Sequence, residues 1–165
     1  MSRSLAADST EKFRSLRAIV TAGLIAGILD ITSAFVLAEI KGTGSIRMLQ
    51  GIASGLLGQQ SFEGAMVTAG LGLAIHFLIA FTAAAGFYAA SRKFNSLIQH
   101  AVVSGLFYGI AVYVFMYWVV VPLAFPNARH SVSRDVTAVI VHMLLIGLPI
   151  SLIVRRYSRP ALRST

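Results

Sequence analysis

Four long runs of apolar residues follow one another along the chain, separated by short stretches that hold most of its charged residues. An α-helix rises about 1.5 Å per residue, so roughly 20 apolar residues are needed to cross the hydrocarbon core of a bilayer. The runs reach that length and predict transmembrane helices over residues 18–38, 65–90, 101–121 and 136–154. We therefore expect an all-α integral membrane protein, a four-transmembrane-helix bundle that forms a single membrane domain over 1–165.

A fifth segment, about 45–58, shows helical periodicity but is too short to span a bilayer. Its apolar positions are Ile46, Leu49, Ile52, Ala53, Leu56 and Leu57. The residues largely opposite them are Arg47, Gln50, Gly51, Ser54 and Gly58. This pattern predicts a short amphipathic or re-entrant helix in the first outer loop. It leaves two alternatives: an interfacial helix that caps the bundle, and a re-entrant helix that lines a pore.

Composition and charge support membrane insertion and argue against nucleic acid as a partner. The chain is 56% hydrophobic and 12% charged, with a mean hydropathy of +0.77, which is too apolar for an ordinary soluble domain. Its net charge of +8 comes from basic residues at the ends of the apolar runs, where they suit a membrane surface. The absence of cysteine excludes disulfides, thiolate metal sites and cysteine nucleophiles.

The distribution of basic residues predicts the orientation. With a cytoplasmic N-terminus, ten basic residues fall inside: Arg3, Lys12, Arg14, Arg17, Arg92, Lys93, Arg155, Arg156, Arg159 and Arg163. Four fall outside: Lys41, Arg47, Arg129 and Arg134. The positive-inside rule therefore predicts a multi-pass membrane protein with both termini cytoplasmic. Trp118 and Tyr117 are expected as aromatic anchors at the outer boundary.

Three of the four predicted spans carry an ionisable residue near mid-depth: Asp30, His76 and His142. Such a group in hydrocarbon costs about 3 kcal/mol on insertion scales, so it normally faces a bundle interior or a cavity. Because the run 18–38 contains Asp30 and exceeds the apolar core of a signal peptide, we expect it to be the first span. Counted from the span centres, the three residues and Tyr113 lie at similar depth, which predicts an Asp–His–His cluster joined by Tyr113.

Small residues place the ionisable groups on close-packing helix faces. Asp30 shares a face with Gly23, Gly27 and Ala34, and His76 shares one with Gly72, Ala80 and Ala83. Gly105 and Gly109 form a similar pair in the third span, where they indicate close packing within the chain or in a dimer.

The polar layer is compatible with three kinds of role. Carboxylate and imidazole chains are the usual parts of intramembrane proton relays. His76 and His142 could instead ligate a haem or a metal ion, although no cofactor is predicted. Polar side chains also hold membrane helices together without further function. The sequence has no H-E-x-x-H, P-loop, G-x-S-x-G or G-x-G-x-x-G motif, so an enzyme is not expected.

The apolar motifs of the spans carry a family resemblance. They are Gly23-Leu-Ile-Ala-Gly27, Ser33-Ala-Phe35, Ala74-Ile-His76-Phe-Leu-Ile-Ala-Phe81, Gly105-Leu-Phe-Tyr-Gly109 and Val141-His142-Met143. With them the chain resembles small, uncharacterised bacterial inner-membrane proteins of the YagU-like group. The resemblance implies a bacterial inner-membrane location and a four-span architecture.

These observations favour a small transporter or channel-like protein whose Asp30/His76/His142 layer handles protons, an ion or a small solute. One four-helix protomer leaves little room for alternating access, so a homo-oligomer in the lipid bilayer is expected. One alternative is a structural or accessory subunit of a larger membrane complex. The other is a b-type haem or metal-binding membrane protein.

Overall fold

The computed structural model describes residues 2–126 and 131–158, with side chains described from residue 11 onward. Within these ranges all regular structure is helical, and four helical segments are long and apolar enough to cross a membrane. The first two are α1 (Ser2–Ile40) and α3 (Ala65–Lys93). The third comprises α5 (Ala101–Phe115), η2 (Met116–Val120) and α6 (Val121–Ala124). The fourth comprises α7 (Val132–Val141), η3 (His142–Gly147) and α8 (Leu148–Ser158). At this level the all-α, four-span prediction is confirmed.

The helices extend beyond the apolar runs that predicted them. Helix α1 starts at Ser2 rather than near residue 18, because the polar stretch before the first run contains neither glycine nor proline to stop it. The third and fourth segments are each interrupted by a stretch of π-helix, η2 and η3, which hydrophobic periodicity did not predict. A short helix, α4 (Ser96–Gln99), connects α3 to α5.

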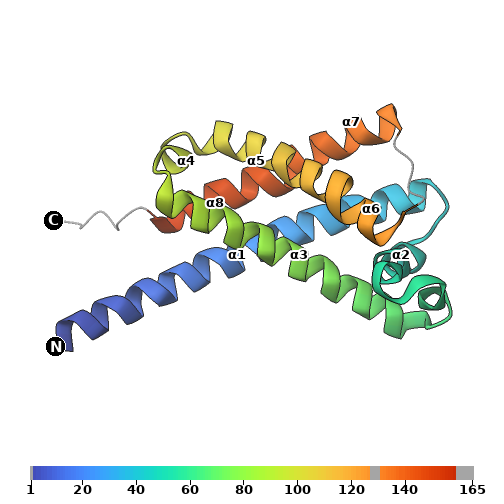
Figure 1. Ribbon diagram of the computed structural model, residues 1–165, viewed down its shortest axis with the longest axis horizontal. Coiled ribbons are helices and arrows are strands. Elements are labelled where there is room, and N and C mark those ends of the chain that lie inside the picture. The colour runs from blue at the N-terminus through green and yellow to red at the C-terminus, as the bar shows by residue number, and fades with distance from the viewer. Residues whose placement is uncertain (1, 127–130, 159–165) are drawn as a thin grey trace.

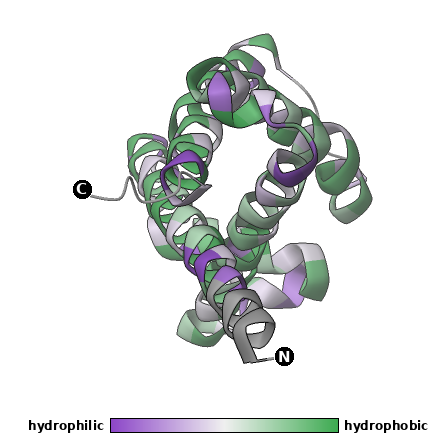
Figure 2. Ribbon diagram, turned by 90° about the vertical axis from the view of Figure 1, so that its left-hand side faces the viewer, coloured by the Kyte–Doolittle hydropathy of each residue, from purple (hydrophilic) through white to green (hydrophobic). Residues whose placement is uncertain are grey.

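Both chain termini lie at one end of the bundle, here called the termini end, and α2 lies at the other, the α2 end (Figure 1). Helices α1 and α3 cross near the middle and diverge toward the α2 end. Helix α1 also packs against α8, and α5 packs against α8 and η3. Seen from the termini end, the helices are arranged around a common centre, and their residues are mostly hydrophobic (Figure 2).

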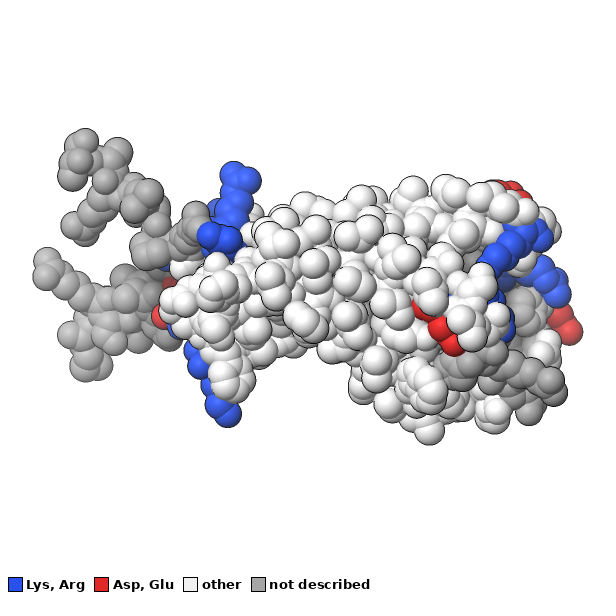
Figure 3. Space-filling model, turned by 90° about the horizontal axis from the view of Figure 1, so that it is seen from above, with Lys and Arg blue, Asp and Glu red and all other residues white. Residues whose placement is uncertain are grey.

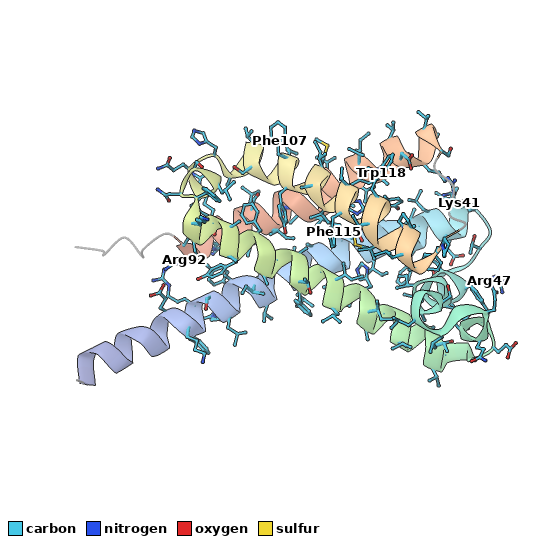
Figure 4. The ribbon with its side chains drawn as sticks, in the orientation of Figure 1. Lys41, Arg47, Arg92, Phe107, Phe115 and Trp118 are labelled. Atoms are coloured by element: carbon cyan, nitrogen blue, oxygen red, sulfur yellow. The ribbon has the colours of Figure 1, made fainter. Side chains whose placement is uncertain are left out.

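Charged side chains gather at the two ends of the molecule and leave an apolar belt between them (Figure 3). Arg92 lies at the termini end, and Lys41 and Arg47 lie at the α2 end (Figure 4). This distribution suits a protein that crosses a bilayer along its long axis. Of the other basic residues used to predict orientation, Arg129, Arg159 and Arg163 and the side chain of Arg3 lie outside the described residues.

The predicted helix in the first loop is present as α2 (Ser45–Leu57), which continues into the 3₁₀ turn η1 (Gly58–Phe62). Gly44 and Gly58 flank it with φ angles of 79° and 62°, in the region that favours glycine. The Glu39 carboxylate accepts hydrogen bonds from the backbone N–H of Ser45, at 2.9 Å, and from its hydroxyl, at 2.7 Å. These bonds fix the start of α2.

Helix α2 fills the space between the diverging α1 and α3 and is seen nearly end-on in Figure 1. A Cβ at Gly72 would lie 2.0 Å from the carbonyl oxygen of Leu49, so only glycine allows this approach. Gln50, which the periodicity placed on the polar face, is instead buried. Helix α3 covers Gln50, and Nε2 of Gln50 donates to the carbonyl of Ala65 at 3.0 Å.

The small residues of the spans pack against partners within the same chain. Gly23 and Gly27 of α1 face the rings of Phe81 and Phe77 of α3. In the other half of the bundle Gly147 faces Gly105 and Gly109 of α5. These glycines therefore make close contacts within the chain.

Candidate functional site

Asp30 and His76 meet at the crossing of α1 and α3. The Nε2 of His76 lies 2.9 Å from the carbonyl oxygen of Gly27. Because a carbonyl only accepts, Nε2 carries the hydrogen, and Nδ1 of the neutral ring is left with a lone pair. This Nδ1 lies 3.9 Å from Oδ2 of Asp30, and the two side chains are 12% and 21% exposed. The pair is thus largely enclosed, and an acceptor nitrogen faces the carboxyl group.

His142 is held in the same way from the other side of the bundle. Its Nδ1 donates to the carbonyl of Ala138 at 2.8 Å, so Nε2 is the acceptor nitrogen of the neutral ring. The imidazole is contacted edge-on by the rings of Tyr113 and Tyr117, each with its centroid 5.9 Å away. The two tyrosine rings are themselves stacked at 4.8 Å. The aromatic contacts fix the orientation of the imidazole.

The π-helical segments place these rings. His142 is the first residue of η3, and η2 begins just after Phe115, between Tyr113 and Tyr117. A Cβ added at Gly109 would lie 2.4 Å from the carbonyl oxygen of His142, so the backbones of α5 and η3 are in close contact here. Single π-turns inside α-helices are frequent at functional sites.

Two cavities meet at this cluster. The larger, here called the vestibule, has a volume of about 520 Å³ and reaches from the α2 end to Asp30, Tyr117 and His142. At its other end it is lined by Lys41, Arg134 and Asp135, which belong to the ends of α1 and α7. The smaller, the inner cavity, has a volume of about 140 Å³ and is lined by Asp30, His76 and His142 among apolar residues. Asp30 and His142 line both cavities.

The inner cavity is closed toward the termini end by the main hydrophobic core. Ile146 lines the cavity and belongs to this core. Behind it Phe87, Ile150 and Val154 are at most 1% exposed. The titratable residues therefore lie where a polar route from the α2 end stops at an apolar barrier.

The structure brings all four sequence-predicted site residues together: Asp30, His76, Tyr113 and His142. It adds Tyr117, which the sequence predicts only as an anchor at the outer membrane boundary. Tyr117 lines the vestibule because it follows Tyr113 by one helical turn and shares its face. That spacing was the signal that could have found it. Lys41, Arg134 and Asp135 also line the vestibule, and none of them was predicted as a site residue.

Among the residues described, no group of three histidine, aspartate or glutamate side chains is arranged to hold a metal ion. A haem ligated by His76 and His142 would have to occupy the inner cavity. Its volume of about 140 Å³ is below the roughly 300 Å³ at which pockets for drug-sized ligands begin.

Comparison with protein-family models, curated proteins and solved structures gives no match to this chain. The resemblance to YagU-like proteins therefore stays a prediction, and the role of the site has to be argued from its own geometry.

Proposed function

We propose that this protein is a small membrane transporter or channel-like protein in which Asp30, His76 and His142 bind and pass on a proton. One observation carries the proposal: each imidazole gives its single N–H to a backbone carbonyl and keeps its other nitrogen as an acceptor, and both rings line one cavity with Asp30, whose carboxyl group lies 3.9 Å from the acceptor nitrogen of His76. A structural hydrogen bond between Asp30 and His76 would instead require a shorter distance than 3.9 Å.

The geometry supports a defined proton path. A proton entering through the vestibule meets Asp30 and His142, which line both cavities, before it meets His76, which lines only the inner one. From Asp30 it passes to Nδ1 of His76 through one water molecule or after a small rotation, because 3.9 Å exceeds direct hydrogen-bond reach. The apolar core around Phe87 stops the proton unless the helices move.

The surroundings of the protein belong to the same proposal. We propose a multi-pass location in a bacterial inner membrane with both termini in the cytoplasm, so that the vestibule opens to the outside. A YagU-like family membership and a homo-oligomeric assembly are proposed with it. Methylation of cysteines introduced at the two ends, in intact cells, tests the orientation, and the mass of the purified protein in detergent tests the assembly.

Proton flux into proteoliposomes tests the function. A potassium diffusion potential drives the flux, and a trapped pH-sensitive dye reports it. We expect Asp30→Asn, which preserves shape and removes the titratable group, to lower the protein-dependent rate on the order of 100-fold. Glu63→Gln is the matched control, because Glu63 is exposed and lies in the turn before α3, away from the cavities.

Equal flux in wild-type protein and Asp30→Asn, with both equally folded, would contradict the proposal. If Asp30→Asn instead impairs only stability or the recovery of a partner protein during purification, the accessory-subunit alternative is favoured.

A further inference from the structure

A third cavity opens sideways from the bundle, between α3 and α5. This lateral groove has a volume of about 420 Å³. Its lining residues are Leu78, Ile79, Thr82, Ala83, Tyr108, Ala111, Val112, Phe115, Met116 and Val120. Figure 4 shows Phe115 on α5 near the middle of the molecule, within the apolar belt seen in Figure 3. In a bilayer the groove therefore opens to hydrocarbon rather than to water.

The polar groups of the groove are already satisfied. The hydroxyl of Tyr108 donates to the carbonyl of Ala83 at 2.6 Å, and the hydroxyl of Thr82 donates to the carbonyl of Leu78 at 2.8 Å. Leu78 and Phe115 are 65% and 58% exposed at its edges. The groove therefore suits an apolar chain or ring and offers little to a polar one.

The groove adjoins the inner cavity. Ile79, Ala83, Val112 and Met116 line both and form a shared wall, in which the side chains of Ile79, Val112 and Met116 can change rotamer to join the two spaces. The thickness of one side chain would therefore separate an apolar group in the groove from the cavity that Asp30, His76 and His142 line. A ligand that occupies both spaces must be apolar at one end and polar at the other.

The inner cavity selects the charge of the polar end. With Asp30 ionised and both rings neutral, the three titratable side chains that line it present acceptors, because both imidazole N–H groups are used by Gly27 and Ala138. Acceptors and a negative charge favour a cationic group that carries hydrogen-bond donors. An anionic head group would face the carboxylate directly.

We propose that the protein binds lipophilic amines in their cationic form, taken up from the bilayer through the lateral groove. The apolar part lies between α3 and α5, and the ammonium group meets Asp30 in the inner cavity. This inference rests on the proposed proton role of Asp30, since the amine and the proton compete for one carboxylate. Exchange of the two at Asp30 couples amine movement to proton movement without any covalent step.

Binding to the full-length protein in nanodiscs of neutral lipid tests the inference. Octylammonium and octyl sulfate have equal tails and opposite charges, and both are titrated calorimetrically at neutral pH with empty nanodiscs subtracted. We expect saturable binding of octylammonium and none of octyl sulfate. Asp30→Asn should weaken the binding of octylammonium about tenfold or more, because the charge-assisted contact is lost.

The groove is tested by filling it. Ala111 is exposed and lines the groove, so Ala111→Phe should block the groove and weaken the binding of octylammonium about tenfold. Val114→Phe adds the same side chain to the same helix outside the groove and should bind as wild type. Thr82→Phe fills the groove from α3. It is used in place of Ala111→Phe if Ala111→Phe unfolds at a lower temperature than the wild-type protein.

Equal binding of the two amphiphiles, or full affinity in both groove variants, would overturn the inference. So would a fall in oligomer mass caused by Ala111→Phe, because a second copy of the chain would then occupy the groove. Asp30-dependent proton flux without octylammonium binding would overturn this inference alone and leave the proposed function standing.

Discussion

The two halves of the bundle have similarly apolar sequences, but the interior of one is tightly packed and the interior of the other contains cavities. Toward the termini end, Ala22, Ala26 and Ala84 let the helices close around Phe87 and Ile150, and no side chain of this group is more than 1% exposed. Toward the α2 end the helices enclose two cavities, a half-buried carboxyl group and two imidazoles. The comparison suggests a division of labour in which one half seals the membrane and the other holds the site.

The difference arises from how the helices meet. Helices α1 and α3 are in closest contact where Gly23 and Gly27 receive two phenylalanine rings, and beyond that crossing they diverge (Figure 1). Helix α2 fills part of the resulting space, and the rest remains as the vestibule and the inner cavity. A buried core residue and a cavity residue should therefore respond differently to the same substitution.

The largest effect is expected from Phe87→Ala in the sealed half. Phe87 is 1% exposed and contacts the ring of Tyr108 edge-on at 5.0 Å, so its removal leaves a void that the helices cannot easily fill. We expect a loss of about 3 kcal/mol in the free energy of unfolding, measured by denaturant titration in mixed micelles. Phe107→Ala is the control, because Phe107 is 68% exposed and should contribute less than about 1 kcal/mol. Equal losses would mean that the sealed half is not tightly packed.

Gly147→Ala should have the next largest effect, at the boundary between the halves. A Cβ there would lie 2.1 Å from the carbonyl oxygen of Gly105, so the two backbones must separate. We expect a destabilisation of about 2 kcal/mol by the same titration. Gly70→Ala meets no atom within 4 Å and should be neutral or stabilise by up to about 1 kcal/mol. A neutral Gly147→Ala would show that this contact is looser than the structure indicates.

A pair of serine substitutions compares access to the two interiors directly. Ser33 lines the vestibule, whereas Ser151 is fully buried in the sealed half, and each hydroxyl bonds to a carbonyl three residues earlier. Because the chain has no cysteine, Ser33→Cys and Ser151→Cys each introduce a single thiol. A water-soluble thiol reagent should modify the thiol at position 33 on the order of tenfold faster or more than the thiol at position 151, since apolar burial disfavours the reactive thiolate. Similar rates would contradict the seal.

The smallest effect is expected for the coupling between Asp30 and His76. A double-mutant cycle with Asp30→Asn and His76→Gln should give an interaction energy of about 1 kcal/mol or less, because the atoms are 3.9 Å apart and partly exposed to the cavity. The cycle is measured by unfolding of the three variants and wild type. A coupling of about 3 kcal/mol or more would indicate a buried ion pair with a structural role instead.

Much of this arrangement was readable from residue spacing. Helical periodicity placed Asp30 beside Gly27 and His76 beside Ala80, and these faces do pack together. The same reasoning failed at Gln50, which α3 covers, because the amphipathicity of one helix carries no information about its neighbours. Tyr117 could have been found from the sequence, since it follows Tyr113 by one helical turn. The π-turns η2 and η3 could not, because they leave little trace in hydrophobic spacing.

The sequence by itself determined the all-helical architecture, the four helical segments long and apolar enough to span a membrane, and the common level of the ionisable residues along them, because hydropathy and a fixed rise per residue set all three. The tertiary structure decided which nitrogen of each histidine remains free and where the cavities open. For His76 and the cavities those features depend on carbonyls, rings and glycines from helices far apart in the chain, whereas His142 uses the Ala138 carbonyl four residues earlier. The packing of the helices against one another, rather than the order of residues, therefore brings Asp30, His76 and His142 together as a candidate site.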